Sequence, residues 1–145
     1  METNIFLSKA DQSLIVKSIE SAELNTSGEI RVHIESSCKA DPVDRAVYIF
    51  NRLKMYETKD RNGVLIYIAY KSRKLSIIGD SGINSKVPAD FWDEIKEKLL
   101  ASFVSGDIVS GLTTAIQMSG EKLKEYFPYT KDDINEQSNE ISFGK

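Results

Sequence analysis

The stretch "TKDRNGVLIYIAYKSRKLSIIGDSGI", residues 58–83, decides the fold. It begins with a charged loop, continues as an apolar run, turns at "KSR" and ends after a second apolar run at Gly-Asp-Ser-Gly. The first run, 64–70, is apolar throughout, which is typical of a strand covered on both faces. The turn is short enough to connect two hairpin strands. The stretch therefore predicts a hairpin of strands 64–70 and 74–79 at the centre of the fold.

The segments around this hairpin predict helices and a further strand. Alternating apolar and polar residues indicate a strand at 29–36 with one wetter face. Helical spacing and capping residues predict four helices, which start at Ser8, after Asp41, near Ala89 and after Asp107. The order α-β-α-β-β-α-α predicts an α/β fold, a three-layer α/β/α sandwich around a mixed sheet of roughly four strands.

Composition places the chain among soluble, single-domain proteins. Its 145 residues are 41% hydrophobic and 28% charged, with a net charge of −3, which argues against nucleic-acid binding and against an anionic membrane as partner. The apolar run 64–70 is far shorter than the roughly 20 residues of a membrane helix. The start "METNIFLSKADQ" does not resemble a signal peptide. With one cysteine, these features predict a cytoplasmic protein without membrane insertion.

The C-terminal residues differ in character from the rest. We expect one domain over residues 1–128, followed by a polar, acidic tail over 129–145. Residues 140–143 alternate and are the candidate for a short fourth strand at the edge of the sheet. We expect the tail to add little to the core. Its oxygen-bearing run Asp132, Asp133, Asn135 and Glu136 is a solvated terminus or a further source of ligands.

Polar residues gather around the ends of the predicted strands. In an antiparallel hairpin, Asp60 before the first strand lies beside Asp80 after the second. A strand-helix-strand connection makes strands 29–36 and 64–70 parallel, so that Glu29 starts at the same edge. Asn62 adds an amide oxygen, and Asp90 closes the loop that begins at Asp80.

Such a set of oxygen donors suits a hard cation, Ca²⁺ or Mg²⁺. Without a cation, clustered carboxylates would repel one another. The same residue types also serve as turn and cap residues, which is their commonest use. The spacing after Asp80 is not that of an EF-hand loop, because the twelfth position carries no Glu. From the residues alone, both readings stay open.

Several motifs resemble the TPM domain family. They are "TSGEIRVHIE", "NGVLIYIA" followed at hairpin spacing by "IIGDSGI", "VPADFW", "FVSGDIVSGL" and "YFP". The resemblance as a whole covers about residues 14–128. The resemblance implies an α/β/α sandwich around a four-stranded sheet and, in some members, divalent-metal binding. It further implies acid phosphatase activity for a plant member, and complex repair or partner regulation for others. The metal positions that carry over are Asp60 and Asp80.

Many relatives in this family carry a signal peptide and a membrane helix or a Gly-rich tail. Neither is recognisable here, so we expect a stand-alone TPM domain that binds Ca²⁺ or Mg²⁺ and acts as a regulatory or protein-interaction module with an unidentified protein partner. The alternative is a metal-assisted acid phosphatase that uses the same carboxylates. No nucleophile motif decides between them. Cys38 lacks the Arg of a cysteine phosphatase loop, and His33, the sole histidine, is expected to pack against a helix.

Overall fold

A four-stranded mixed sheet lies at the centre of the computed structural model, which describes residues 7–129 and 139–144. The strands are β1 (Glu29–Glu35), β2 (Gly63–Ala69), β3 (Lys74–Gly79) and β4 (Ser142–Phe143). Their order across the sheet is β3-β2-β1-β4. β1 runs parallel to β2 and to β4, whereas β2 and β3 form the antiparallel hairpin. The hairpin and the direction of β1 are therefore confirmed.

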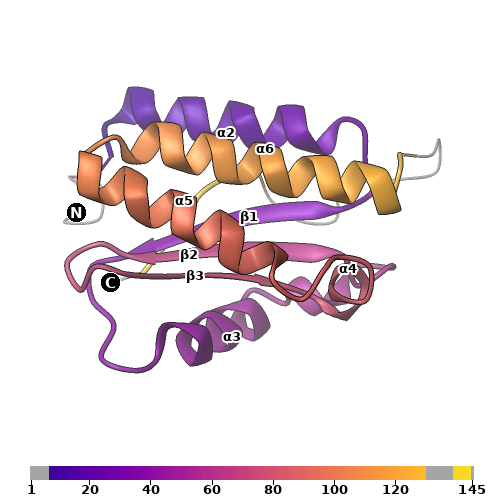
Figure 1. The fold of residues 1–145 in the computed structure, drawn as a ribbon, viewed down its shortest axis with the longest axis horizontal. Helices are drawn as coiled ribbons and strands as arrows, with labels where there is room; N and C mark the ends of the chain where they lie inside the picture. Colours follow the sequence, from indigo (N-terminus) through magenta and orange to yellow (C-terminus); the bar gives the residue numbers. More distant parts are fainter. Residues whose placement is uncertain (1–6, 130–138, 145) are drawn as a thin grey trace.

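Helices cover both faces of the sheet, as Figure 1 shows. They are α2 (Lys9–Glu23), α3 (Pro42–Arg52), α4 (Ser81–Asn84), α5 (Phe91–Ser105) and α6 (Ile108–Tyr126), with a 3-10 turn η1 (Met55–Glu57). α2, α5 and α6 lie on one face, and α3 lies on the other. The predicted α/β/α sandwich is confirmed. The short elements α4 and η1 follow loops and were not predicted.

Local capping residues fix where the helices begin and end. The side chain of Ser8 accepts the backbone N–H of Asp11, and that of Asp107 accepts the N–H of Ser110. Asp41 caps α3 in the same way, with proline at the first helical position. α5 ends at Gly106, whose φ of 83° lies in the left-handed region that glycine tolerates best.

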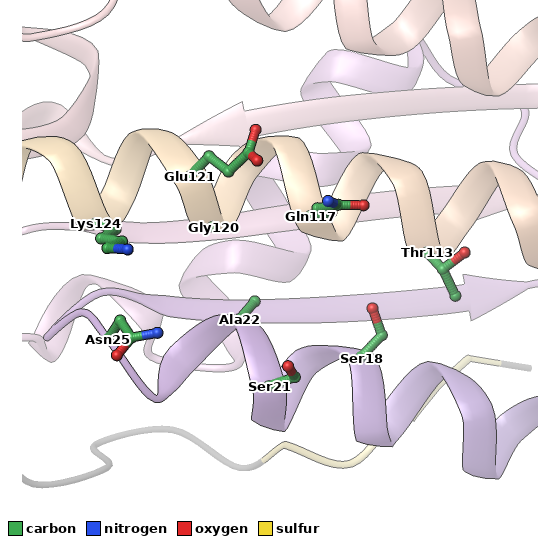
Figure 2. A pocket seen from close by; sticks show the side chains of 9 residues that line it. All are labelled: Ser18, Ser21, Ala22, Asn25, Thr113, Gln117, Gly120, Glu121 and Lys124. Carbon is green, nitrogen blue, oxygen red and sulfur yellow. The ribbon is translucent and has the colours of Figure 1, made fainter.

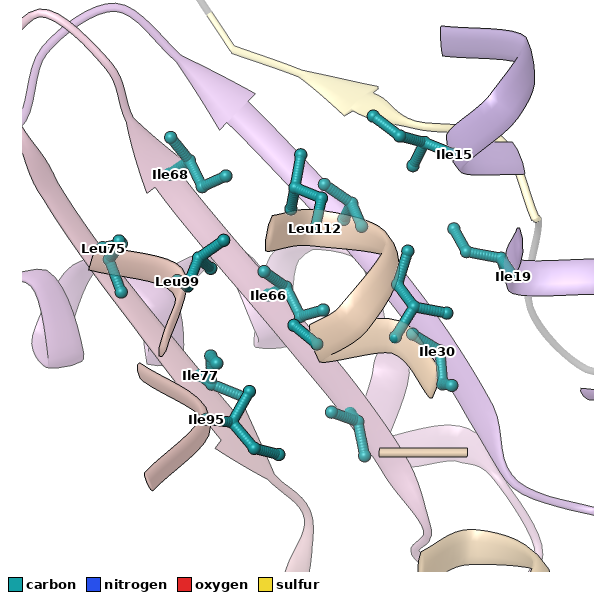
Figure 3. Close-up of a cluster of buried hydrophobic side chains, with 14 of the residues drawn as sticks. Ile15, Ile19, Ile30, Ile66, Ile68, Leu75, Ile77, Ile95, Leu99 and Leu112 are labelled. Atoms are coloured by element: carbon teal, nitrogen blue, oxygen red, sulfur yellow. The ribbon is translucent and has the colours of Figure 1, made fainter. Parts of the chain in front are cut away.

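The main core lies between the sheet and the three-helix layer (Figure 3). It contains Ile15 and Ile19 of α2, Ile30 of β1, Ile66 of β2 and Ile95 of α5, all fully buried. A smaller cluster on the opposite face packs α3 against the sheet. Its members are Cys38, Ala46, Ile49, Phe50, Met55, Leu65, Tyr67 and Ala69. β2 is buried along its whole length, as its continuous apolar run predicts.

The C-terminal segment supplies the short edge strand. Ser142 and Phe143 pair with His33 and Ile34 of β1, so the candidate strand at 140–143 is confirmed. Ile141 and Phe143 pack against the main core, and the expectation that the tail adds little to the core is wrong for this part. Asp132, Asp133, Asn135 and Glu136 lie outside the described residues. Across residues 7–129 and 139–144, no helix is both long and apolar enough to span a bilayer.

Candidate functional site

Three loops meet at the edge of the sheet where β1 and β2 begin and β3 ends. The N–H of Glu29 donates to the carbonyl of Asn62 (3.3 Å), and the N–H of Asp80 donates to the carbonyl of Gly63 (2.9 Å). Two residues further on, the N–H of Gly82 donates to the carbonyl of Arg61 (2.8 Å). The loop before β2 is therefore held between the start of β1 and the loop after β3, as the strand directions predict.

Asp80 is a carboxylate held firmly in place at this edge. Its side chain caps α4 by accepting the N–H of Ser81 (2.7 Å). The guanidinium of Arg61 donates to both carboxylate oxygens of Asp80, with Nε at 2.7 Å from Oδ2 and Nη2 at 3.0 Å from Oδ1. Asp80 is 8% exposed, whereas the Arg61 side chain is 52% exposed. The hydrogen bonds and charge of Asp80 raise the pKa of Arg61, so this is a charged pair with one buried and one accessible partner.

The backbone oxygens of the loop before β2 crowd against Gly82. A Cβ atom on Gly82 would lie 2.0 Å from the carbonyl oxygen of Asp60 and 2.6 Å from that of Arg61. Arg61 itself adopts a left-handed conformation with φ of 50°, which is uncommon for a residue with a side chain. A glycine at 82 is therefore what allows the two loops to touch.

Asn62 lies on the β1 side of the same edge. It is 1% exposed, and its Nδ2 donates to Oγ of Ser27 (3.2 Å). Its backbone N–H donates to Oγ1 of Thr58. Within the described residues, its Oδ1 is buried without a hydrogen-bond partner. A buried acceptor without a hydrogen bond costs folding free energy, so the Asn62 Oδ1 is an acceptor that a ligand could satisfy.

The remaining predicted residues are spread along the edge. Glu29 is buried at the start of β1, and Asp60 is exposed on the loop before β2. Asp90 is exposed at the start of α5, where its side chain makes no capping bond, and it borders a hollow shared with Glu94 and Glu97 of that helix. In the part of the chain that the structure describes, no group of three or more His, Cys, Asp or Glu side chains is arranged to hold a metal ion. The edge therefore gathers the loops without stacking their carboxylates.

A second polar cluster, which the sequence did not predict, lies on the α3 face of β1. Glu35 is 2% exposed and accepts hydrogen bonds from Arg45 Nε (2.8 Å) and Nη2 (3.0 Å), from the Tyr67 hydroxyl and from His33 Nε2 (3.3 Å). Burial acts to raise the pKa of Glu35, but the bonds from Arg45, Tyr67 and His33 hold it below its usual range. Glu35 is therefore a carboxylate saturated by donors.

The charge state of Glu35 settles the tautomer of His33. A carboxylate can only accept, so His33 Nε2 carries the proton that faces it. Nδ1 is then an acceptor, and Ser142 Oγ, 2.9 Å away, donates to it. Burial lowers the pKa of His33, against the opposing effect of Glu35. The alternation of polar residues at 29, 31, 33 and 35 was the signal in the sequence, but it does not say which helix faces them.

A shallow groove between α2 and α6 is the third feature (Figure 2). Its volume is about 370 Å³, and small hydroxyl and amide side chains line it. The helices pack tightly at Gly120, where a Cβ atom would lie 2.7 Å from the Cβ of Ala22. With only Glu121 and Lys124 charged along it, the groove does not offer the converging polar groups that a ligand site needs.

Comparison with known proteins agrees with this fold. The NMR structure of BA42, from the psychrophilic bacterium Bizionia argentinensis, is 46% identical to the chain and superposes with a TM-score of 0.88, covering 96% of both chains. The N-terminal domain of cg2496 from Corynebacterium glutamicum superposes with a TM-score of 0.66 at 14% identity, over 91% of this chain and 82% of that domain, and this likeness shows the fold alone. No curated protein matched the chain.

The family comparison covers most of the sequence. The family model described as "TPM domain" matches residues 2–122. This range includes the hairpin, the converging loops, the helices α2, α3 and α5, and most of α6. This agrees with the resemblance read from the motifs. The chain belongs to the TPM domain family.

Proposed function

We propose that this TPM domain binds a divalent cation, Ca²⁺ or Mg²⁺, at the edge where β1 and β2 begin, and acts as a regulatory or protein-interaction module. One observation carries the proposal. Asp80 is a nearly buried carboxylate, fixed by the N–H of Ser81, whose charge is balanced by a guanidinium that lies half in solvent. Because the exposed guanidinium can move away into solvent, a metal cation could replace it beside the fixed carboxylate.

The donor set around Asp80 fits a hard cation. The backbone carbonyls of Asp60 and Arg61 face Gly82, two residues beyond Asp80. Asn62 contributes a buried Oδ1 without a partner among the described residues. Carboxylate, carbonyl and amide oxygens are the ligands that Ca²⁺ prefers, with water completing six to eight positions. Asp80, these carbonyls and Asn62 would hold the ion, and Glu29 and Asp60 lie on the same edge. Asp90 lies among the acidic residues of α5 and is not needed.

Arg61 supplies the regulatory element. In the ion-free protein it neutralises Asp80, and it must release that carboxylate when a cation takes its place. A bound ion supplies positive charge that joins the loop before β2 to the loop after β3. Release of Arg61 moves a guanidinium on the surface, and this movement would change the surface that a protein partner meets.

Melting curves test the proposal. A ligand at 100 times its dissociation constant stabilises the native state by about 2.7 kcal/mol, which is roughly 5–10 °C for a domain of this size. We expect that shift with Ca²⁺ or Mg²⁺ relative to chelator. Asp80→Asn should abolish most of it, and the exposed Asp93→Asn on α5 should keep it. Arg61→Gln should retain or enlarge the shift, because the competing cation is gone.

Two outcomes would count against the module. If wild type melts at one temperature in Ca²⁺, Mg²⁺ and chelator, Asp80 is simply an ion-pair and cap residue. If the cations activate hydrolysis of a generic phosphomonoester and Asp80→Asn removes that activity, the same edge is a metal-assisted phosphatase site. The assay and the melting curves together separate a binding module from an enzyme.

A further inference from the structure

The polar cluster around Glu35 opens into a cavity of about 440 Å³. The cavity lies between α3 on one side and β1 with the segment 142–144 on the other. α3 packs mainly on β2 and β3 and reaches β1 through the Arg45–Glu35 pair, beside which the cavity opens. Its volume is within the range of small-molecule sites, and no function discussed so far uses it.

The lining divides into an apolar part and a few polar groups. Tyr48, Ile49 and Leu53 of α3 form the apolar part. His33, Glu35 and Ser142 provide polar atoms, and the first two are at least nine-tenths buried. A wall that combines apolar side chains with a small number of fixed polar groups suits a small organic ligand that carries both kinds of surface.

Arg45 and Arg52 set the charge of the cavity. Among the described residues that line it, they are the cations, Glu35 is the anion and His33 is neutral at pH 7, so one positive charge is left over. Glu35 already has four donors, and its ion pair uses Nε and Nη2 of Arg45. The guanidinium of Arg52 takes no part in that pair. An incoming anion would therefore not compete with Glu35 for Arg52.

Tyr48 holds both guanidinium groups in place. Its ring lies under Arg45, whose Cζ is 5.1 Å from the ring centroid. Its hydroxyl accepts a hydrogen bond from Arg52 Nη1 (3.2 Å). Positioned guanidinium groups bind planar carboxylates through paired N–H donors. The half-exposed ring of Tyr48 also offers a flat apolar surface beside the charge.

We propose that this cavity binds a small monocarboxylate with an apolar body, with Arg52 as the principal anion-binding residue and Arg45 as a second donor. A single surplus positive charge matches a monoanion better than a dianion. The apolar wall of α3 takes the body of the ligand, and the segment 142–144 closes the far side. This site is independent of the proposed cation site, because it lies on different loops and uses different residues.

Titration followed by NMR tests the site, with benzoate as probe. Benzamide serves as its neutral match and inorganic phosphate as the dianion. We expect saturable benzoate binding with a dissociation constant of about 1 mM or tighter, and shifts of the His33 ring signal. Benzamide should bind at least about tenfold more weakly. Arg52→Gln, an exposed substitution, should weaken benzoate about tenfold or more, while Arg73→Gln, which removes the same charge at the hairpin tip, should leave affinity within about twofold.

The contrary results are equally specific. Absence of saturable shifts would overturn the proposal, and so would equal binding of benzamide, since the charge would then play no part. Equal effects of Arg52→Gln and Arg73→Gln would mean general attraction of anions. Tighter binding of phosphate than of benzoate would overturn the assignment to a monocarboxylate. A melting curve of Arg52→Gln at wild-type temperature shows that the variant is folded.

Discussion

Oε2 of Glu23, in the last turn of α2, accepts the backbone N–H of Ile30 in β1 at 2.7 Å. β4 pairs with β1 at His33 and Ile34, so the Ile30 N–H lies beyond the end of that pairing. A side chain from a helix thus satisfies a backbone donor at the edge of the sheet. Burial, with help from the charges of Glu29 and Glu20, raises the pKa of this carboxyl to about 8, even though the Ile30 bond lowers it.

The first prediction follows from this pKa and concerns stability against pH. Native Glu23 keeps its proton up to about pH 8, whereas the unfolded chain loses it near 4.5. The native state therefore binds more protons between these values, and the free energy of unfolding falls as pH rises through this window. The loss should be on the order of 2–4 kcal/mol. Glu23→Gln should remove it and be more stable than wild type at pH 8.5, as urea unfolding at several pH values would show.

A matched variant separates this effect from the general charge of the chain. Glu20→Gln removes a neighbouring carboxylate of α2 that is exposed. It should leave most of the pH dependence in place. If Glu20→Gln and Glu23→Gln flatten the curve equally, the slope does not come from the buried carboxyl.

The second prediction concerns His33, whose effect on the pH dependence of stability is opposite to that of Glu23. Burial lowers its pKa below 6.5. Below pH 6.5 His33 therefore binds a proton in the unfolded chain while it stays neutral in the native protein. The free energy of unfolding then falls as pH decreases. Because His33 is the sole histidine of the chain, its ring signal can be followed by NMR without ambiguity. A midpoint at or above 6.5 would contradict the buried, neutral imidazole.

The third prediction concerns the contact between the two loops at Gly82. Gly82→Ala places a methyl group 2.0 Å from the backbone oxygen of Asp60, and backbone cannot rotate away as a side chain can. The loops must separate, and we expect a loss of about 1–3 kcal/mol in the free energy of unfolding. Ser81→Ala, at an exposed neighbouring position, is the control and should cost far less. Urea denaturation of both variants measures the difference, and equal costs would mean that the loops are not in contact.

The fourth prediction concerns the crossing of α2 and α6. Gly120→Val adds atoms where a Cβ would already lie 2.7 Å from the Cβ of Ala22. The helices must move apart, at a cost of about 1–3 kcal/mol. Gln117→Ala changes an exposed residue on the same groove and should be near neutral. A thermal melt of the two variants tests the crossing, and a Gly120→Val protein as stable as wild type would disprove it.

Strand order and direction could be predicted because they depend on local pattern and connection. The apolar run of β2 and the short turn before β3 define the hairpin. The α3 crossover makes β1 parallel to β2, which brings Glu29 level with Gly63. Such rules fix the backbone at the edge of the sheet, and the convergence of its loops follows from them.

The partners of the side chains could not be predicted in the same way. From the sequence, Asp80 is expected to meet other carboxylates and to be repelled by them. In the structure it meets Arg61, whose backbone is left-handed, a conformation that the local sequence pattern does not specify. An Asp80→Asn substitution in the metal-free protein therefore removes an attraction rather than a repulsion. The pairing of Glu35 with Arg45 likewise depends on where α3 settles on the sheet, which no local pattern specifies.

The short strand β4 borders the cavity at Glu35, and its opening should set how often that side of the cavity is exposed to solvent. Ser142 and His33 are 109 residues apart in the chain. β4 is joined to β1 by two paired residues and by the hydrogen bond from the Gly144 N–H to the Ile34 carbonyl (2.8 Å). So small a unit can detach by sub-global opening while the rest stays folded. The Gly144 amide should therefore exchange with solvent deuterium far sooner than the Tyr70 amide, which follows β2 and donates to the backbone carbonyl of Glu35. A molecule that occupies the cavity would slow that exchange, so the rate at Gly144 reports occupancy directly.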